Sequence, residues 1–528
     1  MNNFVLVTFY VITYSCLSFV FCKHALMIFQ QQHYELRRYS NWLFNKSNIH
    51  FSSTILYSAI LIIIEILYIN GIFNSTTSML FSLVLTVCYT IYLLYKESNK
   101  VYIKDLVITK RVKRQIVVFA ILLLLSIYLF MFLNIGLLLG IFAIFIPYLL
   151  IYPMFFITYP FEETIKKHYE DDAKKILYSY DDLIKIGITG SYGKTSTKNI
   201  INDIISQNYL TLITPSSYNT PMGITRTIRE MLKPIHEVFI CEMGADKVND
   251  IFYLMDFVKP KYGIVTSIGP QHLATFDSID NIVKEKMKEI EMLPSDGVGF
   301  INLDNEFIQN YSINNKCKIV SVGIDNDKAD YVAKNVKYSN NGSSFTVKIK
   351  NRNHKFTTSL LGKHNITNIL IGIAVALELG IPLKQIVENV KNVKQVEHRL
   401  EVKEINNFTF IDDAFNSNPV GSKMAVDVLN LMRGKRVIIT PGMIDLGTSE
   451  NDLNYEFGKY MANKVDFVIL VGEKQTKFIY NGLVDNKFNM DNVIVFANIR
   501  DAMNYVYLNF SSEDTILLEN DLPDAFSK

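Results

Sequence analysis

The sequence predicts a multidomain chain, with an N-terminal bundle of transmembrane helices followed by two α/β domains. Three observations lead to this prediction. The 528 residues exceed what one compact domain usually holds. The apolar residues are concentrated in the first third, and strand patterns alternate with helical patterns over the rest. A Gly-Lys-Thr sequence at residues 193–195 lies where a short apolar strand pattern passes into a helical one.

The stretch 185–199, KIGITGSYGKTSTKN, predicts a phosphate-binding loop between a strand at 183–188 and a helix ending near Ser206. Glycines let backbone N–H groups turn toward an anion, and the helix N-terminus adds partial positive charge. Lys194 would reach the terminal phosphates, and the Thr195 hydroxyl would bind Mg²⁺. Ile188 stands where the commonest form of the motif has its first glycine, so a chance match is the alternative. The residues expected to contact the nucleotide are Gly190, Ser191, Tyr192, Gly193, Lys194, Thr195 and Ser196.

Charge and cysteine content disfavour several other classes of function. A formal net charge of +2, with the lysines spread along the chain, gives no reason to expect a nucleic-acid partner. The five cysteines include no Cys-x-x-Cys pair, which favours reduced thiols over a disulfide framework or a zinc site.

The apolar segments of the first third predict five membrane-spanning helices. Three lie at residues 4–22, 54–69 and 79–95, and the stretch 115–158 is long enough to cross twice, with a hairpin at 134–136. A cleaved signal peptide is the alternative for the first segment, but it lacks a positively charged start and further spans follow. Residues 30–45 are interpreted either as an interfacial helix or as a solvated loop with aromatic anchors.

Basic residues in the loops predict the orientation. Lysines and arginines gather between spans one and two and between spans three and four, whereas the other two connections have none. Because such loops stay inside the cell, we expect the N-terminus outside and everything after the fifth span in the cytoplasm, where ATP is found. The expected localisation is therefore the inner (plasma) membrane, with several spans and cytoplasmic catalytic domains.

The central part predicts a parallel sheet with functional residues at the carboxyl ends of its strands. A buried strand at 238–241 leads to Glu242, which would face the phosphate loop and hold Mg²⁺, although an acid at this place is otherwise often a loop solubiliser. The next strand, at 262–267, leads to His272 and then to a helix with Lys284 and Lys286. Composition alone does not distinguish these two lysines.

Six ordered motif regions resemble the Mur ligases, most of all the branch that adds D-alanyl-D-alanine to a peptidoglycan precursor. They are TGSYGKTS, CEMGA, SIGPQHLATF followed by KEKMKEI, GKHNITN at 362–368, EHRLEV at 397–402 and IDDAFNSNP at 411–419. The resemblance covers about two thirds of the chain, from residue 182 onward. It implies an enzyme that uses ATP to phosphorylate a carboxylate and then joins the acyl phosphate to an amine, leaving ADP and phosphate.

The resemblance also assigns roles to single residues. It implies that Lys194, His272, Lys286 and Arg399 act in catalysis, with His272 on a second Mg²⁺. Lys286, fourteen positions after His272, matches the family lysine that is carbamylated and so becomes an oxygen ligand; an exposed helix lysine is the alternative. The metal ligands implied are Thr195, Glu242, His272 and Lys286. The nucleotide contacts implied beyond the phosphate loop are Asn365, Asn368, Arg399 and Asp413, with His364, Asn416 and Asn418 beside them.

The domains expected are a transmembrane region at 1–160, a charged and helical linker at 161–181, an ATP-binding domain at 182–396 and a Rossmann-like C-terminal domain at 397–528. The acceptor-binding domain of the Mur ligases has no counterpart here, and spans stand in its place. We therefore expect a membrane-borne carboxylate acceptor of the cell envelope or capsule, such as one carried on a polyprenyl lipid, with an amino acid or dipeptide as the amine.

Two other functions stay open. One is the housekeeping D-alanyl-D-alanine-adding enzyme with a membrane anchor. The other is a transporter driven by nucleotide hydrolysis, which the scarcity of ionisable residues in the spans beyond Glu65 disfavours. An inactive scaffold is a further alternative, which the presence of Lys194, Glu242 and His272 disfavours.

Overall fold

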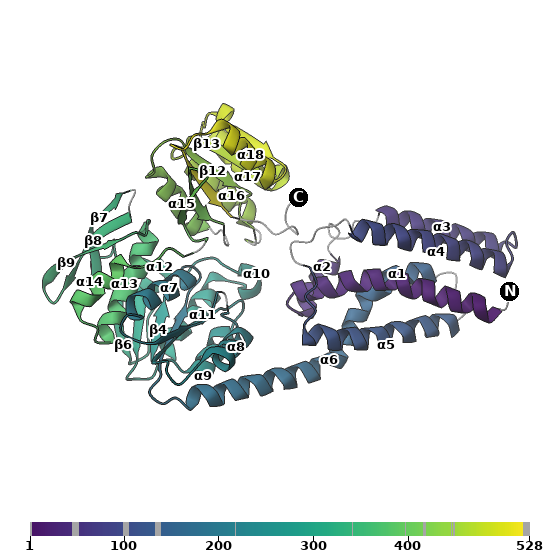
Figure 1. Ribbon diagram of the computed structural model, residues 1–528, viewed down its shortest axis with the longest axis horizontal. Helices are drawn as coiled ribbons and strands as arrows, with labels where there is room; N and C mark the ends of the chain where they lie inside the picture. The colour runs from purple at the N-terminus through teal and green to yellow at the C-terminus, as the bar shows by residue number, and fades with distance from the viewer. Residues whose placement is uncertain are drawn as a thin grey trace. The chain divides into compact units, whose positions relative to one another are not determined.

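The computed structural model describes the chain apart from residues 1–2, 45–51, 99–104, 133–138, 217, 340–341, 397, 415–418, 445, 447–448 and 521–528. The chain divides into two compact units, Met1–His168 and Tyr169–Lys528. The first unit is helical, and the second contains two α/β domains (Figure 1).

The helices of the first unit are mostly long and apolar. They are α1 (Asn3–Gln31), α2 (Leu36–Phe44), α3 (Ser52–Ile69), α4 (Ser75–Ser98), α5 (Lys110–Phe132) and α6 (Leu139–Tyr178). Of these helices, α2 is short and carries two arginines. Among the described residues, four segments are long and apolar enough to cross a membrane: Val11–Gln31, Ser75–Ser98, Lys110–Leu129 and Ala143–Tyr178. The expected span at 54–69 forms a shorter apolar helix, Thr54–Ile69. The expected hairpin at 134–136 lies outside the described residues.

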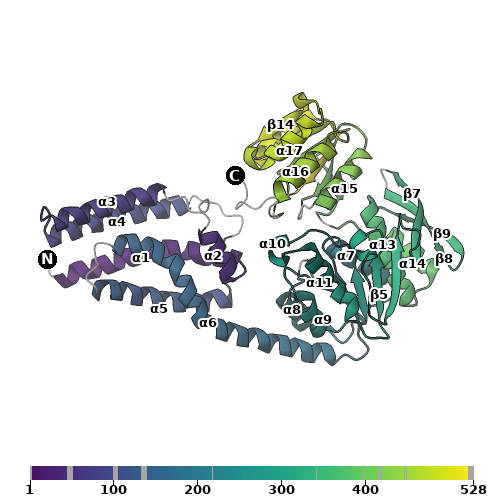
Figure 2. The same cartoon turned by 180° about the vertical axis from the view of Figure 1, so that it is seen from behind.

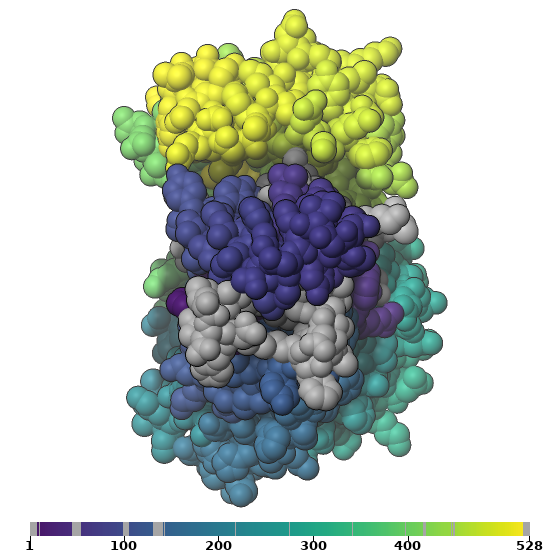
Figure 3. Space-filling view, turned by 90° about the vertical axis from the view of Figure 1, so that its right-hand side faces the viewer, coloured from purple at the N-terminus to yellow at the C-terminus, as the bar shows by residue number. Residues whose placement is uncertain are grey.

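Polar side chains join α3 and α4, which lie side by side in Figures 1 and 2 and whose indigo atoms face the viewer in Figure 3. The Tyr57 and Thr86 hydroxyls are 2.9 Å apart, and so are those of Thr54 and Tyr89. All four side chains are buried, whereas Ile55, on the same helix, is exposed. Burying hydroxyls in pairs and leaving apolar groups outside is the pattern expected of helices that pack in an apolar solvent.

The segment at 30–45 contains a helix rather than only a solvated loop. Within α2, Tyr39 is fully buried and donates its hydroxyl to the Tyr148 carbonyl at 3.0 Å. The expected linker at 161–181 also lacks a break at its start, because α6 continues to Tyr178.

The central domain is built on a nine-stranded sheet with the order β2-β3-β1-β4-β5-β6-β7-β8-β9. The pairings from β2 to β7 are parallel, and β7, β8 and β9 are joined antiparallel. The strands are β1 (Ile184–Thr189), β2 (Thr211–Ile213), β3 (Val238–Glu242), β4 (Tyr262–Val265), β5 (Val298–Asn302), β6 (Lys318–Gly323), β7 (Tyr331–Ser339), β8 (Gly342–Ile349) and β9 (Arg352–Thr358).

Helices cover both faces of this sheet (Figures 1 and 2). They are α7 (Lys194–Ile205), α8 (Pro221–Met231), α9 (Asp250–Val258), α10 (Leu273–Phe276), α11 (Ile279–Glu291), α12 (Glu306–Gln309), α13 (Lys363–Glu378) and α14 (Leu383–Lys391). Successive residues of a strand point to opposite faces, so Ile240 packs in the core with α7 and α13 while Phe239 packs with α8, α9 and α11. Because both faces of the sheet are buried, these strands are continuous apolar runs in the sequence.

The C-terminal domain has a six-stranded sheet with the order β10-β11-β15-β12-β13-β14. Its strands are β10 (Glu401–Ile405), β11 (Phe408–Asp413), β12 (Arg436–Thr440), β13 (Phe467–Val471), β14 (Val493–Phe496) and β15 (Thr515–Glu519). All pairings are parallel except β10 with β11. The helices are α15 (Pro419–Asn430), α16 (Glu450–Met461), α17 (Glu473–Asp485), the 3₁₀ helix η3 (Met490–Asn492) and α18 (Ile499–Asn509).

Candidate active site

The loop between β1 and α7 has the conformation that its glycines allow. Gly190 and Gly193 have φ of 148° and 83°, and a Cβ on Gly190 would lie 2.1 Å from the Thr266 hydroxyl. The segment after β4 holds the loop, because Ser191 N–H donates to the Ser267 carbonyl at 2.7 Å and the Thr266 hydroxyl donates to the Tyr192 carbonyl at 2.6 Å. These two contacts hold the loop in the conformation that its glycines allow.

Lys194 opens α7 and turns its side chain back over this loop. Its ammonium donates to the carbonyls of Gly190 at 2.7 Å and Ser191 at 3.1 Å. Burial lowers the pKa of Lys194, and the nearby charge of Glu242 opposes the shift. A cation at the mouth of a loop of backbone N–H groups is suited to a phosphate chain.

Glu242 lies at the carboxyl end of β3, the strand next to β1. Both oxygens of its carboxylate have hydrogen-bonding partners. Oε1 accepts from the Thr195 hydroxyl at 3.2 Å and from the Asn219 amide at 3.0 Å, and Oε2 lies 3.0 Å from the Lys198 ammonium. Burial alone would raise the pKa of Glu242, but the charges of Lys198 and Lys194 outweigh it and lower the pKa. Glu242 is therefore a carboxylate at neutral pH.

Sequence reasoning missed Lys198 and Asn219. Lys198 is 1% exposed and also donates to the Ser216 carbonyl at 2.8 Å, so it joins α7 to the loop that carries Asn219. The signal for Lys198 was its spacing, since a residue four positions after Lys194 lies on the same helix face. Asn219 had no comparable signal, because only the fold brings its loop beside Glu242.

Replacing Lys198 by Met should destabilise the central domain by about 3 kcal/mol, because it leaves a buried carboxylate without its main partner. The shift of the thermal midpoint measures the loss. The double variant with Glu242→Gln should recover most of the midpoint, since the unpaired charge is then removed. A double variant as unstable as Lys198→Met would show that lost packing, rather than the charge pair, causes the effect.

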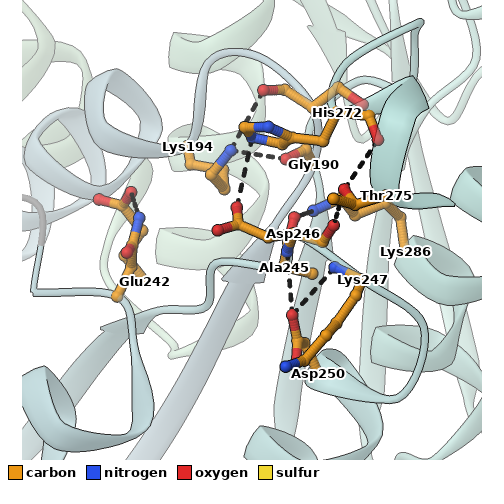
Figure 4. A network of polar contacts seen from close by, with 12 residues as sticks. Gly190, Lys194, Glu242, Ala245, Asp246, Lys247, Asp250, His272, Thr275 and Lys286 are labelled. Carbon is orange, nitrogen blue, oxygen red and sulfur yellow. Dashed lines mark hydrogen bonds and ion pairs between the residues drawn. The ribbon is translucent and has the colours of Figure 1, made fainter. Parts of the chain in front are cut away.

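A second polar cluster follows β3 and β4. The His272 Nε2 lies 3.4 Å from Asp246 Oδ1, and Figure 4 shows the ring and the carboxylate facing each other beside Lys194. His272 has φ of 53°, and the Thr275 hydroxyl of the following turn donates to the Asp246 carbonyl. Asp246 is a further residue that sequence reasoning missed.

Lys286 extends from α11 toward the loop that follows β3. Its side chain is 1% exposed and its ammonium donates to the Ala245 carbonyl at 3.3 Å. Burial, together with the positive charge of Lys194, lowers the pKa of Lys286 to about 7. Lys284, two residues earlier, is exposed, so the structure separates the two lysines that composition left equal.

The donor groups fit Mg²⁺ better at the phosphate loop than at His272. Thr195 and Glu242 supply a hydroxyl and a carboxylate, and Mg²⁺ in nucleotide sites is commonly held by one or two such oxygens together with phosphates and water. Across the described ranges, no three His, Cys, Asp or Glu side chains are grouped as a metal site. Lys286 as an ammonium cannot bind a cation, whereas a carbamate on it would supply oxygens.

Asn368, on α13, has a free donor beside the phosphate loop. Its Oδ1 accepts from the Thr197 hydroxyl at 3.0 Å and would lie 3.5 Å from a Cβ on Gly193. Its Nδ2 is buried without a partner in the described part of the chain. A buried donor left unpaired is costly, so this amide fits a site where a nucleotide supplies the acceptor. Asn365, one turn earlier, donates instead to the Leu361 carbonyl at 2.8 Å.

His364 is the neighbouring side chain that the motif also singled out. Burial lowers the pKa of His364 to about 4, so its imidazole is neutral at physiological pH. The neutral ring adds no charge beside Asn365, the next residue in the chain.

Arg399 and Asp413 lie together where the C-terminal domain begins. The Leu400 N–H donates to Asp413 Oδ1 at 3.1 Å. Burial raises the pKa of Asp413 to about 7, and the Arg399 charge opposes this. Burial lowers the pKa of Arg399, while the charges of Asp413 and Glu242 raise it. Lys194, Glu242 and Arg399 thus lie within electrostatic reach of one another, whereas Asn416 and Asn418 fall outside the described residues.

Family models match most of the second unit. The Mur ligase middle domain matches residues 188–376, and the model described as Mur ligase, glutamate ligase domain matches residues 398–519. A UDP-N-acetylmuramoyl-tripeptide–D-alanyl-D-alanine ligase of Bacillus subtilis is 30% identical over 339 residues, which is 63% of this chain and 72% of that enzyme. The chain belongs to the Mur ligase family. It is therefore an ATP-dependent ligase, as the motifs predicted.

Other relatives of this Mur ligase carry the same enzyme name or the name MurF. The enzyme of the same name from Escherichia coli is 29% identical over 292 residues, which cover 55% of this chain and 64% of that enzyme. MurF of Acinetobacter baumannii has a TM-score of 0.61 at 23% identity over 67% of this chain and 77% of that one. MurF of Thermotoga maritima, solved in complex with ADP, has a TM-score of 0.61 at 20% identity over 67% of this chain and 80% of that one. These structural likenesses support the fold of the two α/β domains.

Proposed function

We propose that this Mur ligase joins a carboxylate to an amine through an acyl phosphate, forms ADP, and acts on a cell-envelope or capsule precursor at the cytoplasmic face of the membrane. The observation that carries the proposal is the grouping of Lys194, Glu242 and the Asp246–His272 pair at the ends of neighbouring parallel strands. That is where open α/β sheets bind their ligands. ATP and Mg²⁺ are the cofactors that this family uses.

The chemistry needs two transfers. An acceptor carboxylate oxygen attacks the γ-phosphorus and ADP leaves, and an amine then attacks the acyl carbon, loses a proton and expels phosphate. Lys194 and the backbone N–H groups of the loop would hold the phosphates, and Arg399 would bring further positive charge to the same anions. Mg²⁺ on Thr195 and Glu242 would supply charge neutralisation. A carbamate on Lys286, with His272, would hold a second Mg²⁺.

The membrane part of the proposal rests on the first unit. The four apolar segments are long enough to cross a bilayer, and the family models begin only at residue 188. Basic residues flank the expected inner ends of the helices, which supports cytoplasmic catalytic domains. The acceptor would then be a carboxyl-bearing sugar or peptide on a polyprenyl lipid, and the amine an amino acid or a dipeptide.

The names of the relatives favour a second candidate. Those enzymes are named for a soluble UDP-N-acetylmuramoyl-tripeptide and for D-alanyl-D-alanine. Because the alignments leave 28–36% of those two enzymes uncovered, their acceptor need not carry over. This chain would then be a membrane-anchored enzyme of peptidoglycan synthesis.

Phosphate release from the purified full-length protein should require acceptor and amine together, because the acyl phosphate forms only on a bound carboxylate and expels phosphate only when the amine attacks it. The lipid-linked and the UDP-linked acceptor are each offered with D-alanyl-D-alanine or an amino-acid pool, and the product is identified by mass spectrometry. Turnover with the lipid-linked acceptor alone supports the membrane-borne substrate, and turnover with the UDP-linked peptide supports the second candidate. Phosphate release that needs no amine would contradict both.

A further inference from the structure

The basic end of α5 is fastened to the end of α1. The Gln30 side chain accepts from the Val107 N–H at 2.9 Å and donates to the Val107 carbonyl at 2.9 Å. The same amide donates to the Tyr34 hydroxyl at 3.0 Å. Thr109 then caps α5 by accepting from the Val112 N–H at 3.2 Å. The first turn of α5 is therefore held in a fixed place beside Tyr34.

Arg111, in this first turn, has hydrogen-bonding capacity that the chain does not use. Its guanidinium carbon lies 3.8 Å from the centre of the Tyr34 ring. Its Nε is buried and has no partner within the described part of the chain. Arg114 differs, because it donates through Nε and Nη2 to the two oxygens of Glu162, each at 2.7 Å. Glu162 is thus largely neutralised by Arg114, although its charge and that of Glu163 also reach Arg111.

Gln115 adds a second unused group on the same face of α5. Its side chain is 1% exposed, and neither amide atom has a partner among the residues that the structure describes. Helical side chains lean toward the N-terminus, so Gln115 leans over the turn that contains Arg111, four residues earlier. A buried amide that bonds to nothing costs free energy, and a leucine of similar size would avoid that cost. A buried amide without partners, one helical turn from a guanidinium whose Nε is also unpaired, points to a missing ligand.

We propose that Arg111, Gln115 and the backbone N–H groups of Lys110 and Arg111 bind the phosphate group of a membrane lipid. A guanidinium, an amide donor and a helix N-terminus each favour an anion with several acceptor oxygens. Lys110 adds positive charge at the start of the same helix. The apolar surface of α5, which exposes Val117 and Ile121, suits a ligand with a hydrocarbon tail rather than a soluble phosphate. This inference rests on the proposed function, in which a lipid-borne acceptor is used.

The test uses the full-length protein in detergent without ATP. A polyprenyl monophosphate is the probe, with the polyprenol of equal length and inorganic phosphate as comparisons, and binding is measured by native mass spectrometry and by the thermal midpoint. We expect the lipid phosphate to bind and to raise the midpoint, and the other two compounds to do neither. Equal binding of the polyprenol would overturn the phosphate site, and equal binding of inorganic phosphate would overturn the lipid.

Three variants locate the site. Arg111→Gln and Lys113→Gln each remove one positive charge from the same helical turn, but only Arg111 belongs to the proposed site. We expect Arg111→Gln to weaken binding more than tenfold and Lys113→Gln less than twofold. Gln115→Leu should also weaken binding more than tenfold while leaving the midpoint without lipid unchanged or higher. Equal losses in both charge variants, or a destabilised Gln115→Leu that binds normally, would contradict the proposal.

The binding experiment and the ligase assay can contradict the lipid site and the proposed function independently of each other. Binding that is lost in Arg111→Gln, with product formed only on a soluble acceptor, would keep the lipid site and remove the membrane-borne substrate. Product formed on a lipid-linked acceptor at equal rates in wild type and Arg111→Gln, with no lipid binding, would keep the proposed function and remove this site.

Discussion

Replacing Lys194 by Met should lower the rate of ATP-dependent ligation by about 10²–10³-fold, the usual loss when one preorganised electrostatic group is removed. The ammonium is held over the phosphate loop by the carbonyls of Gly190 and Ser191, so it is in place before the nucleotide binds. Methionine keeps much of the side-chain volume and removes the charge. The measurements are kcat for phosphate release with acceptor and amine saturating, and the dissociation constant of ATP.

Lys284→Met provides the matched control for this variant. Lys284 is exposed on α11 in the same domain, so the same substitution there should leave kcat within about twofold. The thermal midpoint of both variants shows whether the fold is intact. A Lys194→Met enzyme with normal kcat would remove the assignment of the phosphate loop to ATP.

Much of the fold was predictable because the apolar pattern of a segment in the sequence agrees with the buried position that the segment takes in the fold. The strands predicted at 183–188 and 238–241 agree to within one residue with β1 (Ile184–Thr189) and β3 (Val238–Glu242). Each is a short apolar run in a mostly parallel sheet, where both faces are covered by helices and no alternation is needed. The phosphate loop was predictable for a related reason, since Gly190 and Gly193 have positive φ in the structure and few other residues adopt it readily.

The contacts that complete the site were harder to predict because they join distant segments. Asn219 reaches Glu242, and Asp246 reaches His272, only because β2, β3, β1 and β4 lie next to one another in an order unlike their order in the chain. The number of membrane helices was hard to predict for a different reason. Hydropathy located the apolar segments, but helix length depends on where the chain turns, and the segment at 54–69 forms a shorter helix than the other four.

Replacing Lys286 by Ala should abolish turnover, because we expect Lys286 to carry a carbamate that binds Mg²⁺. Carbamylation joins a neutral amine to CO₂ and releases a proton. With a pKa of about 7, about half of the Lys286 amines are neutral at pH 7, whereas an ordinary lysine has fewer than about one in a thousand. Because the pKa is lowered, the neutral amine is lost as pH falls below 7, and activity should fall with it.

Chemical rescue separates this role from a structural one. Added short carboxylates should restore part of the activity of Lys286→Ala, since they can place an oxygen ligand in the space that the side chain leaves. The same compounds should do nothing for Lys194→Met, which lacks a cation rather than an anion. Lys284→Ala should keep full activity and need no rescue. Normal turnover of Lys286→Ala would show that the buried amine serves only the packing of α11 against the loop at Ala245.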